Sequence, residues 1–250
     1  MRTLLALIDE SGYYLIRLAS DVKEEKMGPE ASILLHRYAA VYIEIPKVAC
    51  TSMKAAFAQL LGINLAQLGG NPHQVSFPSP ARSRTANGPL FPGLFAFAFV
   101  RNPWARLVSC YRDKIAGEVA GFTGFTIRPG VDDCFADFAT FNAGMSFDEF
   151  VAAVASIPDT EADAHFRSQH TFVTNEGGEL AIDFVGRYET LLSDFQHVQQ
   201  RVGLSNIHLP WLQAAPSRTR YHDYYTSDTR QMVAERFQKD IALFTYEFDG

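Results

Sequence analysis

Short apolar runs alternate with amphipathic stretches along this chain of 250 residues, and the alternation predicts strands followed by helices. Residues 39–45 are expected to form a short, largely buried strand, and the continuous apolar run 94–100 is typical of a central strand in a parallel sheet. After each run, apolar residues recur every three or four positions, as on one face of an amphipathic helix. The pattern predicts an α/β fold of three layers, with helices flanking a central parallel sheet of about five strands.

Three further helices are predicted towards the C-terminus. Ser146 and Glu149 have the spacing of a capping box, which opens the first helix, and Ile157 and Pro158 end it. The apolar stripes of the other two helices are Leu191, Phe195, Val198 and Val202, closed by Gly203, and Val233, Phe237, Ile241 and Phe244. We expect one domain over residues 1–250, with its ligand-binding core in 39–115.

Two connecting segments have the composition of loops. Residues 71–92 are rich in Pro, Ser, Arg and Asn, and we expect an irregular surface loop there. Residues 116–146 combine Gly, Thr and Asp with several phenylalanines. This second segment is either a loop or lid over an acceptor site or an ordinary surface loop packed by its own aromatic side chains.

Residues suited to binding an anion are concentrated where the first predicted strand meets its helix, in the segment 46–54 (Pro-Lys-Val-Ala-Cys-Thr-Ser-Met-Lys). A helix N-terminus presents backbone N–H groups and a partial positive charge, and therefore binds phosphate or sulfate. Lys47 and Lys54 add formal charge, and Thr51 or Ser52 can cap the helix and contact an anion. The alternative is a capped helix with two solvated lysines.

The second predicted strand ends in a similar junction. Arg101 directly follows the apolar run, and Pro103 suits the first turn of a helix while it favours an extended Asn102. Ser109 lies further along that helix. Because an arginine fork and a hydroxyl together suit a phosphate dianion, both junctions are candidate anion sites. Ligands of parallel α/β sheets bind beyond the carboxyl ends of the strands, where both junctions fall.

These two segments resemble motifs of the nucleotide-dependent sulfotransferases, and most of all those of the carbohydrate branch with the chondroitin, dermatan and uronosyl 2-O-sulfotransferases. The resemblance implies that a Pro-Lys-x-x-x-Thr-Ser loop grips the 5′-phosphosulfate of 3′-phosphoadenosine 5′-phosphosulfate (PAPS). It also implies that an Arg-(Asp/Asn)-Pro element, with Ser eight residues after the Arg, holds the 3′-phosphate. The nucleotide-binding residues expected on this basis are Pro46, Lys47, Val48, Ala49, Cys50, Thr51, Ser52, Met53, Lys54, Arg101 and Ser109.

Later stretches of the chain extend the likeness. Residues 163–169 and 183–191 resemble the branch's His-(Trp/Phe)-Arg and Val-Gly-(Lys/Arg)-(Tyr/Phe)-Glu-Thr-Leu segments, and 224–248 resembles its C-terminal helix. The resemblance therefore covers 41–248 in patches. Ala49 and Met53 depart from it, because the family often has Gly and Trp or Phe at these positions.

The resemblance implies a metal-free sulfotransferase that transfers the sulfuryl group of PAPS to a hydroxyl of a carbohydrate or glycolipid, with 3′-phosphoadenosine 5′-phosphate (PAP) as product. Lys47 and the backbone amides of 49–53 would neutralise charge on the bridging oxygen. The segment 46–54 lacks the glycines of a nucleotide triphosphatase loop, which argues against a kinase. The alternatives are a sulfotransferase for small alcohols or phenols and a non-catalytic PAP-binding protein.

Two histidines are candidates for the catalytic base. His73 lies between the two anion-binding segments, and we expect it to deprotonate the acceptor. His165 is the second candidate, and we expect it to contact the acceptor sugar. Glu44 is a third candidate, although it precedes the loop and is also suited to pairing with Lys47 or Lys54. Cys50 is interpreted as a small residue that fits the helix start.

Composition and net charge limit the classes of partner that this protein is expected to bind. The net charge of −6 argues against nucleic acid and anionic membranes as partners. No run approaches the about 18 apolar residues of a membrane span, and 1–8 is too short for a signal-peptide core. The three cysteines form neither a metal-binding spacing nor a complete disulfide framework. We expect a soluble, cytoplasmic catalytic domain of bacterial type, with no metal; the sequence leaves its oligomeric state open.

Overall fold

The computed structural model describes residues 2–8, 14–20, 31–117, 135, 137–204, 207–210 and 220–249. They form two compact units that interleave along the chain. Unit 1 contains Met1–Ile45, Ala49–Phe99 and Phe172–Leu212, and unit 2 contains Pro46–Val48, Val100–Thr171 and Gln213–Gly250. Most of the predicted loop or lid at 116–146 lies outside the described residues, and the expectation of a single domain stays a prediction.

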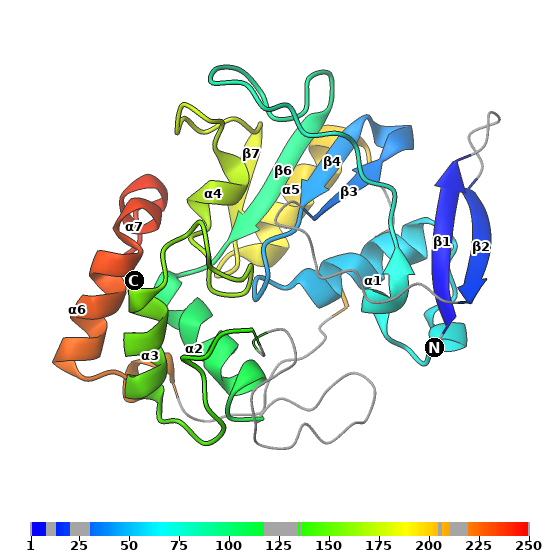
Figure 1. Cartoon of the computed structure of the whole chain (residues 1–250). Coiled ribbons are helices and arrows are strands. Elements are labelled where there is room, and N and C mark those ends of the chain that lie inside the picture. Colours follow the sequence, from blue (N-terminus) through cyan, green and yellow to red (C-terminus); the bar gives the residue numbers. More distant parts are fainter. Residues whose placement is uncertain are drawn as a thin grey trace. The chain divides into compact units, whose positions relative to one another are not determined.

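The main sheet of unit 1 has four strands in the order β3-β4-β6-β7 (Figure 1). They are β3 (Ser32–Leu35), β4 (Ala40–Ile43), β6 (Phe95–Val100) and β7 (Phe184–Arg187). β4 and β6 are parallel, with Ile43 opposite Ala98, so the chain leaves both strands at the same edge of the sheet. Asp183 is hydrogen-bonded to Ala96 and Gly186 lies against Phe99, a register that makes β7 parallel to β6 as well.

The structure confirms an α/β fold with a central sheet of mostly parallel strands flanked by helices, but a fully parallel sheet is wrong. β3 pairs antiparallel with β4. The two strands are joined by the short 3₁₀ helix η1 (His36–Tyr38), with Ala39 in the left-handed region at φ 46°. So short a connection returns the chain directly beside itself, whereas a parallel pair needs a crossover of about a dozen residues.

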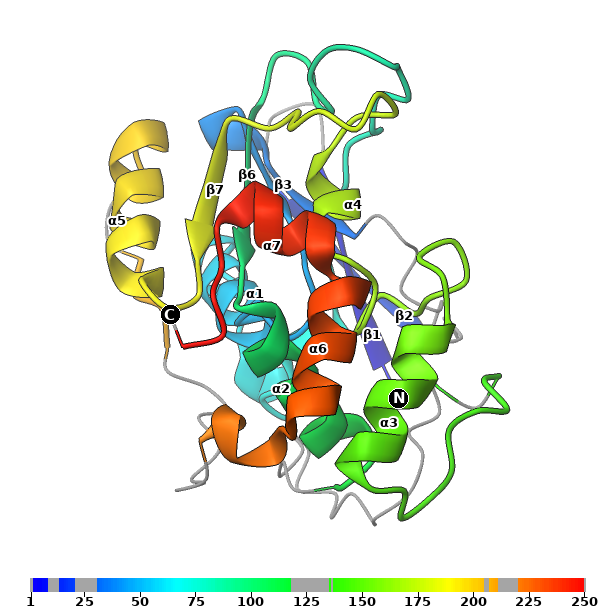
Figure 2. The ribbon, with the colours of Figure 1, turned by 90° about the vertical axis from the view of Figure 1, so that its left-hand side faces the viewer.

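Helices α1 (Cys50–Leu60) and α5 (Leu191–Val202) pack against this sheet. The ring of Phe57, on α1, lies 5.5 Å from that of Tyr42 and 6.5 Å from that of Phe97. α5 runs beside β7 (Figure 2), and the approach is close at Gly186. A Cβ atom there would lie 2.5 Å from the ring of Phe99, so only glycine fits without displacement. As predicted, Gly203 ends α5, in the left-handed conformation.

A second sheet of unit 1 has the order β2-β1-β5. Its strands are β1 (Arg2–Ile8), β2 (Tyr14–Ser20) and β5 (Val75–Ser76). Two 3₁₀ helices, η2 (Leu65–Leu68) and η3 (Pro72–Gln74), precede β5. The predicted irregular loop 71–92 therefore begins with a short helix and a strand. About five strands in one sheet is also wrong for the described residues, because β1, β2 and β5 pair with one another and not with the main sheet.

Unit 2 is built from helices α2 (Pro103–Lys114), α3 (Phe147–Ser156), α6 (Ser227–Arg236) and α7 (Gln238–Phe244), with the 3₁₀ helix η5 (Tyr221–Tyr224). Helix α4 (His170–Val173) crosses the boundary between the units in the sequence. The core of unit 2 is rich in aromatic side chains, among them Trp104, Phe135, Phe141, Phe150 and Phe166.

Two predictions about helix ends in unit 2 have different outcomes. The capping box of Ser146 and Glu149 is present and opens α3. The predicted last helix is instead two helices, α6 and α7, which are separated at Phe237 (φ −111°, ψ 24°). The apolar stripe did not indicate the break, because Val233, Phe237 and Phe244 are all buried. Within the described part of the chain, no helix has the length and apolar character that crossing a membrane requires.

Candidate functional site

The segment that follows β4 contains a strained turn. Lys47 has φ 68° and Ala49 has φ 52°, and they are two of the four non-glycine residues with positive φ among those described. A side chain in this region costs about 1–2 kcal/mol, and such residues cluster at functional sites. Turns that contain left-handed residues also present successive backbone N–H groups, as anion-binding loops do.

The helix cap differs from the sequence prediction. Ala49 is the N-cap residue of α1, and no side chain caps it, so capping by Thr51 or Ser52 is wrong. α1 begins at Cys50, two residues earlier than a cap at Thr51 requires. Thr51 and Ser52 therefore lie within the first turn and are buried. Their hydroxyls stay candidates for contact with an anion.

In unit 1, a chain of polar contacts leads from β4 to the first turn of α1. Lys54 Nζ lies 2.9 Å from a carboxylate oxygen of Glu44, which is 2% exposed. The same ammonium lies 3.4 Å from Nδ1 of His73. Nε2 of that ring lies 3.0 Å from the Thr51 hydroxyl. The expected pairing of Glu44 with Lys54 is confirmed, and the charge of Lys54 is thereby largely balanced inside the protein.

In unit 2, the second predicted motif contacts the first one. The Arg101 guanidinium donates to the Lys47 carbonyl at 3.2 Å, and Arg106 Nε donates to the Pro46 carbonyl at 3.0 Å. Asn102 caps α2, since its side-chain oxygen accepts from the backbone N–H groups of Trp104 and Ala105. Pro103 occupies the first position of that helix, as predicted. Ser109 lies in the second turn of α2 and is partly exposed.

Arg106 joins backbone segments of unit 2, a role that was not predicted from the sequence. Besides Pro46, it donates to the carbonyls of Arg167 at 2.8 Å and Ala164 at 2.9 Å. The side chain is buried, and burial lowers the pKa of its guanidinium to about 10. One signal was available: Arg106 lies four residues before Cys110, on the apolar stripe of the helix, where an isolated charge requires a partner.

The segment 167–170 is fixed against the same junction. The side-chain amide of Gln169 accepts from the Arg101 backbone N–H at 2.9 Å and donates to the Arg101 carbonyl at 2.8 Å. The buried carboxylate of Asp240, on α7, accepts from the backbone N–H groups of Gln169 and His170. Arg101 and the 163–170 segment are therefore held in one hydrogen-bonded framework.

Lys47 itself lies in a charged cluster of unit 2. Its ammonium is 2.8 Å from Asp113 on α2, and the Lys114 ammonium is 3.6 Å from the same carboxylate. Burial alone would raise the pKa of Asp113, but Lys47, Lys114 and, more weakly, His165 hold it below its ordinary value. Asp113 is thus an anion beside a lysine that the sequence assigns to the phosphosulfate.

His165 borders this cluster and is paired with a carboxylate. Asp163 Oδ1 lies 2.6 Å from Nδ1 of His165 and also accepts from the His165 backbone N–H at 2.8 Å. Burial is the main cause that lowers the pKa of His165, Lys114 and Lys47 act in the same direction, and Asp163 opposes them. Burial therefore favours the neutral form of this imidazole.

The structure places the predicted residues in two groups. Unit 2 contains Lys47, Arg101, Ser109 and His165, and unit 1 contains Thr51, Ser52, Lys54 and His73. Asp113 and Asp163 were not recognised as partners of Lys47 and His165. Asp113 lies 66 residues from Lys47, so no local spacing indicates that pair. The pairing of Asp163 with His165 could have been predicted from the sequence, because an Asp side chain often accepts a hydrogen bond from the backbone N–H two residues later.

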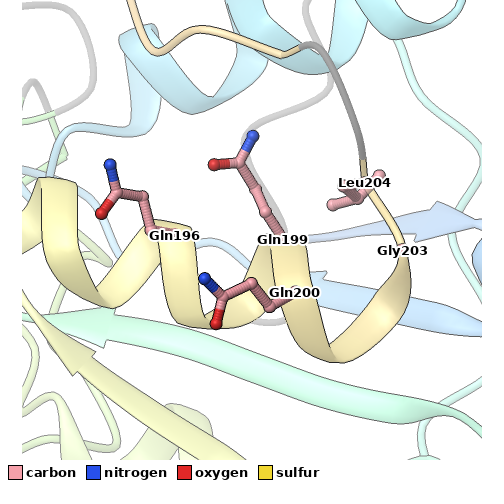
Figure 3. A pocket seen from close by; sticks show the side chains of 5 residues that line it. All are labelled: Gln196, Gln199, Gln200, Gly203 and Leu204. Carbon is pink, nitrogen blue, oxygen red and sulfur yellow. The ribbon is translucent and has the colours of Figure 1, made fainter.

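A cavity of about 580 Å³ opens on α5 in unit 1. Figure 3 shows its described lining, which is Gln196, Gln199, Gln200, Gly203 and Leu204. These residues have no ionisable side chain and belong to neither anion-binding motif. Elsewhere among the described residues, no group of three or more His, Cys, Asp or Glu side chains could hold a metal ion.

Fold and site together define a class: an α/β protein in which the segments after two adjacent parallel strands contact each other and carry candidate anion-binding residues. A family model described as "Sulfotransferase family" matches residues 32–247, and the chain therefore belongs to the sulfotransferase family. No solved structure matches the chain.

The curated relatives that the chain resembles are named as carbohydrate sulfotransferases. The chain is similar to "Carbohydrate sulfotransferase 11" of Mus musculus, with 28% identity over 82% of this chain and 64% of the relative. It is also similar to "Carbohydrate sulfotransferase 14" of Danio rerio, with 26% identity over 84% of this chain and 60% of the relative. The chain thus spans less than two thirds of the length of these relatives.

Proposed function

We propose that this protein transfers the sulfuryl group of PAPS to a hydroxyl group of a carbohydrate and releases PAP. Family membership and relatives named as carbohydrate sulfotransferases support the reaction class. The observation that carries the proposal is the contact between the two motifs. Arg101 and Arg106 of the second motif bind the carbonyls of Lys47 and Pro46 in the first.

The residues present suit the nucleotide that the motifs imply. The strained turn at Lys47 and Ala49 and the start of α1 offer backbone N–H groups, and Lys47 offers an ammonium. We assign Lys47, Thr51, Ser52 and the amides of 49–53 to the 5′-phosphosulfate. Arg101 and Ser109 are assigned to the 3′-phosphate, because an arginine fork binds phosphate oxygens in pairs.

When bound, PAPS supplies an activated sulfuryl group on a phosphate leaving group. The task of Lys47 is to stabilise the negative charge that develops on the departing phosphate oxygen. That charge is largest in the transition state, so the ammonium contributes mainly to turnover. Lys47 is bound to Asp113 in the present structure, and contact with the nucleotide requires it to turn from that carboxylate.

Two variants test the assignments. Lys47→Ala should lower the rate of transfer from radiolabelled PAPS to a panel of sugars about 10²–10³-fold. Its PAP affinity, measured by calorimetry, should change only a few-fold. Arg101→Ala should instead weaken PAP binding at least tenfold, and change little the binding of adenosine 5′-phosphosulfate, which lacks the 3′-phosphate. Lys239→Ala, on the exposed side of α7, is the matched control.

The outcomes also separate the alternatives. Tight PAP binding without transfer to any sugar, alcohol or phenol would identify a non-catalytic PAP-binding protein. Transfer to phenols or small alcohols alone would replace the carbohydrate by a small acceptor. Near-normal turnover in Lys47→Ala, or equal losses of both nucleotides in Arg101→Ala, would contradict the residue assignments.

A further inference from the structure

The ammonium of Lys47 has a counter-ion inside unit 2. It donates to the carboxylate of Asp113, on α2, at 2.8 Å. Both side chains are largely buried, with 13% of the Lys47 side chain and 19% of the Asp113 side chain exposed. Water and salt therefore screen this ion pair less than they screen a pair on the open surface. The ammonium that we assign to the phosphosulfate is thus bound to an anion of the protein itself.

The main chain at Lys47 is fixed from two sides. The Lys47 carbonyl accepts from the Arg101 guanidinium at 3.2 Å, and the Pro46 carbonyl accepts from Nε of the buried Arg106 at 3.0 Å. Lys47 itself has φ 68°, a conformation that persists only where surrounding contacts enforce it. A change of partner at the ammonium therefore requires only rotation of the lysine side chain, and its four-carbon stem is flexible.

Asp113 has a second cation beside it. The Lys114 ammonium lies 3.6 Å from the same carboxylate oxygen that Lys47 contacts. Burial would raise the pKa of Asp113, but Lys47 and Lys114 hold it below its ordinary value, so the carboxylate is an anion at neutral pH. Removing the only partner of a buried charge is strongly destabilising. Because Lys114 stays beside Asp113, departure of Lys47 would not leave this carboxylate without a cation.

A phosphate group offers Lys47 the same kind of partner as Asp113 does. Both groups are oxyanions that accept charge-assisted hydrogen bonds from an ammonium. Two anions beside one ammonium also repel each other, so the two partners compete.

We propose that Asp113 is a positioning residue, which holds the Lys47 ammonium in the free protein and gives it up when the 5′-phosphosulfate of PAPS binds. The inference rests on the proposed sulfuryl transfer and adds a residue that neither motif assigns. The Asp113 carboxylate keeps Lys47 in one place before the nucleotide arrives. Its contact with Lys47 also lowers nucleotide affinity, because the ion pair must break before Lys47 can bind the ligand.

Competition for Lys47 acts at one end of the nucleotide. Lys47 is assigned to the 5′ end, whereas Arg101 and Ser109 are assigned to the 3′-phosphate. A ligand with a 5′-phosphate must displace Asp113, and a ligand without this group leaves the ion pair intact. PAP and adenosine 3′-phosphate differ in the 5′-phosphate alone, so a comparison of the two isolates the exchange.

The test measures both ligands by calorimetry. Asp113→Asn keeps the shape of the side chain and removes its charge, so Lys47 no longer has a competing anion. This variant should bind PAP about 3–10-fold more tightly than the wild type. Its affinity for adenosine 3′-phosphate should change by less than about twofold, because this ligand does not engage Lys47. Asp113→Ser removes the charge with a smaller side chain and should change both affinities in the same way.

Turnover shows when the exchange takes place. If Lys47 leaves Asp113 as the nucleotide binds, Asp113→Asn stabilises the bound complex and the transition state equally. The variant should therefore lower the KM for PAPS without raising kcat. Asp148→Asn, at an exposed position on α3, is the matched control, and thermal unfolding of every variant detects loss of fold.

The outcomes are distinguishable from failure of the proposed function. A wild type that binds PAP, together with uncharged variants that bind it no more tightly, would overturn the inference alone. Equal changes for both ligands, a higher kcat at unchanged KM, or loss of fold in both variants would also overturn it, because Asp113 would then have another role. A wild type that binds neither PAP nor adenosine 3′-phosphate would overturn the proposed function and the inference with it.

Discussion

Replacement of Arg106 is the sharpest test of how the site is held together. Arg106→Met keeps most of the side-chain volume and removes every donor. Three carbonyls would lose a charged partner, those of Pro46, Ala164 and Arg167, at 3.0, 2.9 and 2.8 Å from the guanidinium. Because they come from two segments of unit 2 far apart in the sequence, the variant should loosen both segments together.

The expected loss in free energy of unfolding is the difference between two opposing contributions, the hydrogen bonds of Arg106 and the cost of burying its charge. Hydrogen bonds from a charged donor contribute about 1.5–3 kcal/mol each, so the three together are worth roughly 4–9 kcal/mol. Burial of the cation offsets part of this. It lowers the Arg106 pKa from its ordinary value to about 10. A shift of that size corresponds to about 3 kcal/mol. We therefore expect Arg106→Met to lower the free energy of unfolding by about 2–5 kcal/mol, because unpaired buried carbonyls replace the bonds.

Calorimetry measures the loss of stability in Arg106→Met as a lower Tm. For a chain of this length, 1 kcal/mol changes Tm by about 2–4 °C, so Arg106→Met should lower Tm by roughly 5–15 °C. Arg106→Lys should recover only part of the loss, because one ammonium cannot reach three carbonyls in the fixed geometry of a guanidinium. Arg84→Ala, at an exposed position, serves as the control and should change Tm by less than about 2 °C. A Tm for Arg106→Met within 2 °C of the wild type, or full recovery with lysine, would refute the reasoning.

Two other predictions concern packing and acid stability. Gly186→Ala should lower the free energy of unfolding, measured in urea, by about 1–3 kcal/mol, because the new Cβ meets the Phe99 ring. Adding Phe99→Leu to this variant should recover part of the loss. No loss in the single variant would contradict the close approach. Burial would raise the pKa of Asp159, but hydrogen bonds from Arg236 and Ser168 lower it. This carboxylate therefore stabilises the fold above its unfolded-state pKa of about 3.9. The stabilisation is lost as the pH falls through the lower pKa of the folded state. Wild type should therefore exceed Asp159→Asn in stability at pH 7, with a smaller gap at pH 3, and an equal gap at both pH values would be inconsistent with this pairing.

Local features were determined by the sequence alone. The apolar runs located β4 and β6, the Asn102-Pro103 pair opened α2, and Gly203 ended α5. These signals act over a few residues, through side-chain period and backbone preference, so no knowledge of the fold is needed to interpret them. The motifs around Lys47 and Arg101 likewise indicated the sulfotransferase family, which the family model confirms.

The tertiary structure decided which side chains meet. Lys47 pairs with Asp113 across 66 residues, and Arg106 reaches the Ala164 carbonyl across 58. The antiparallel β3 and the break at Phe237 also went unpredicted, since neither changes the apolar period.

The contacts of the two candidate histidines illustrate the same point. The sequence gives both rings the same chemistry, and only their neighbours distinguish them. Asp163 lies against Nδ1 of His165, whereas Lys54 and Thr51 lie against the two ring nitrogens of His73. Thr51 and Lys54 lie 22 and 19 residues from His73 in the sequence, and only the packing of these segments brings them to the ring.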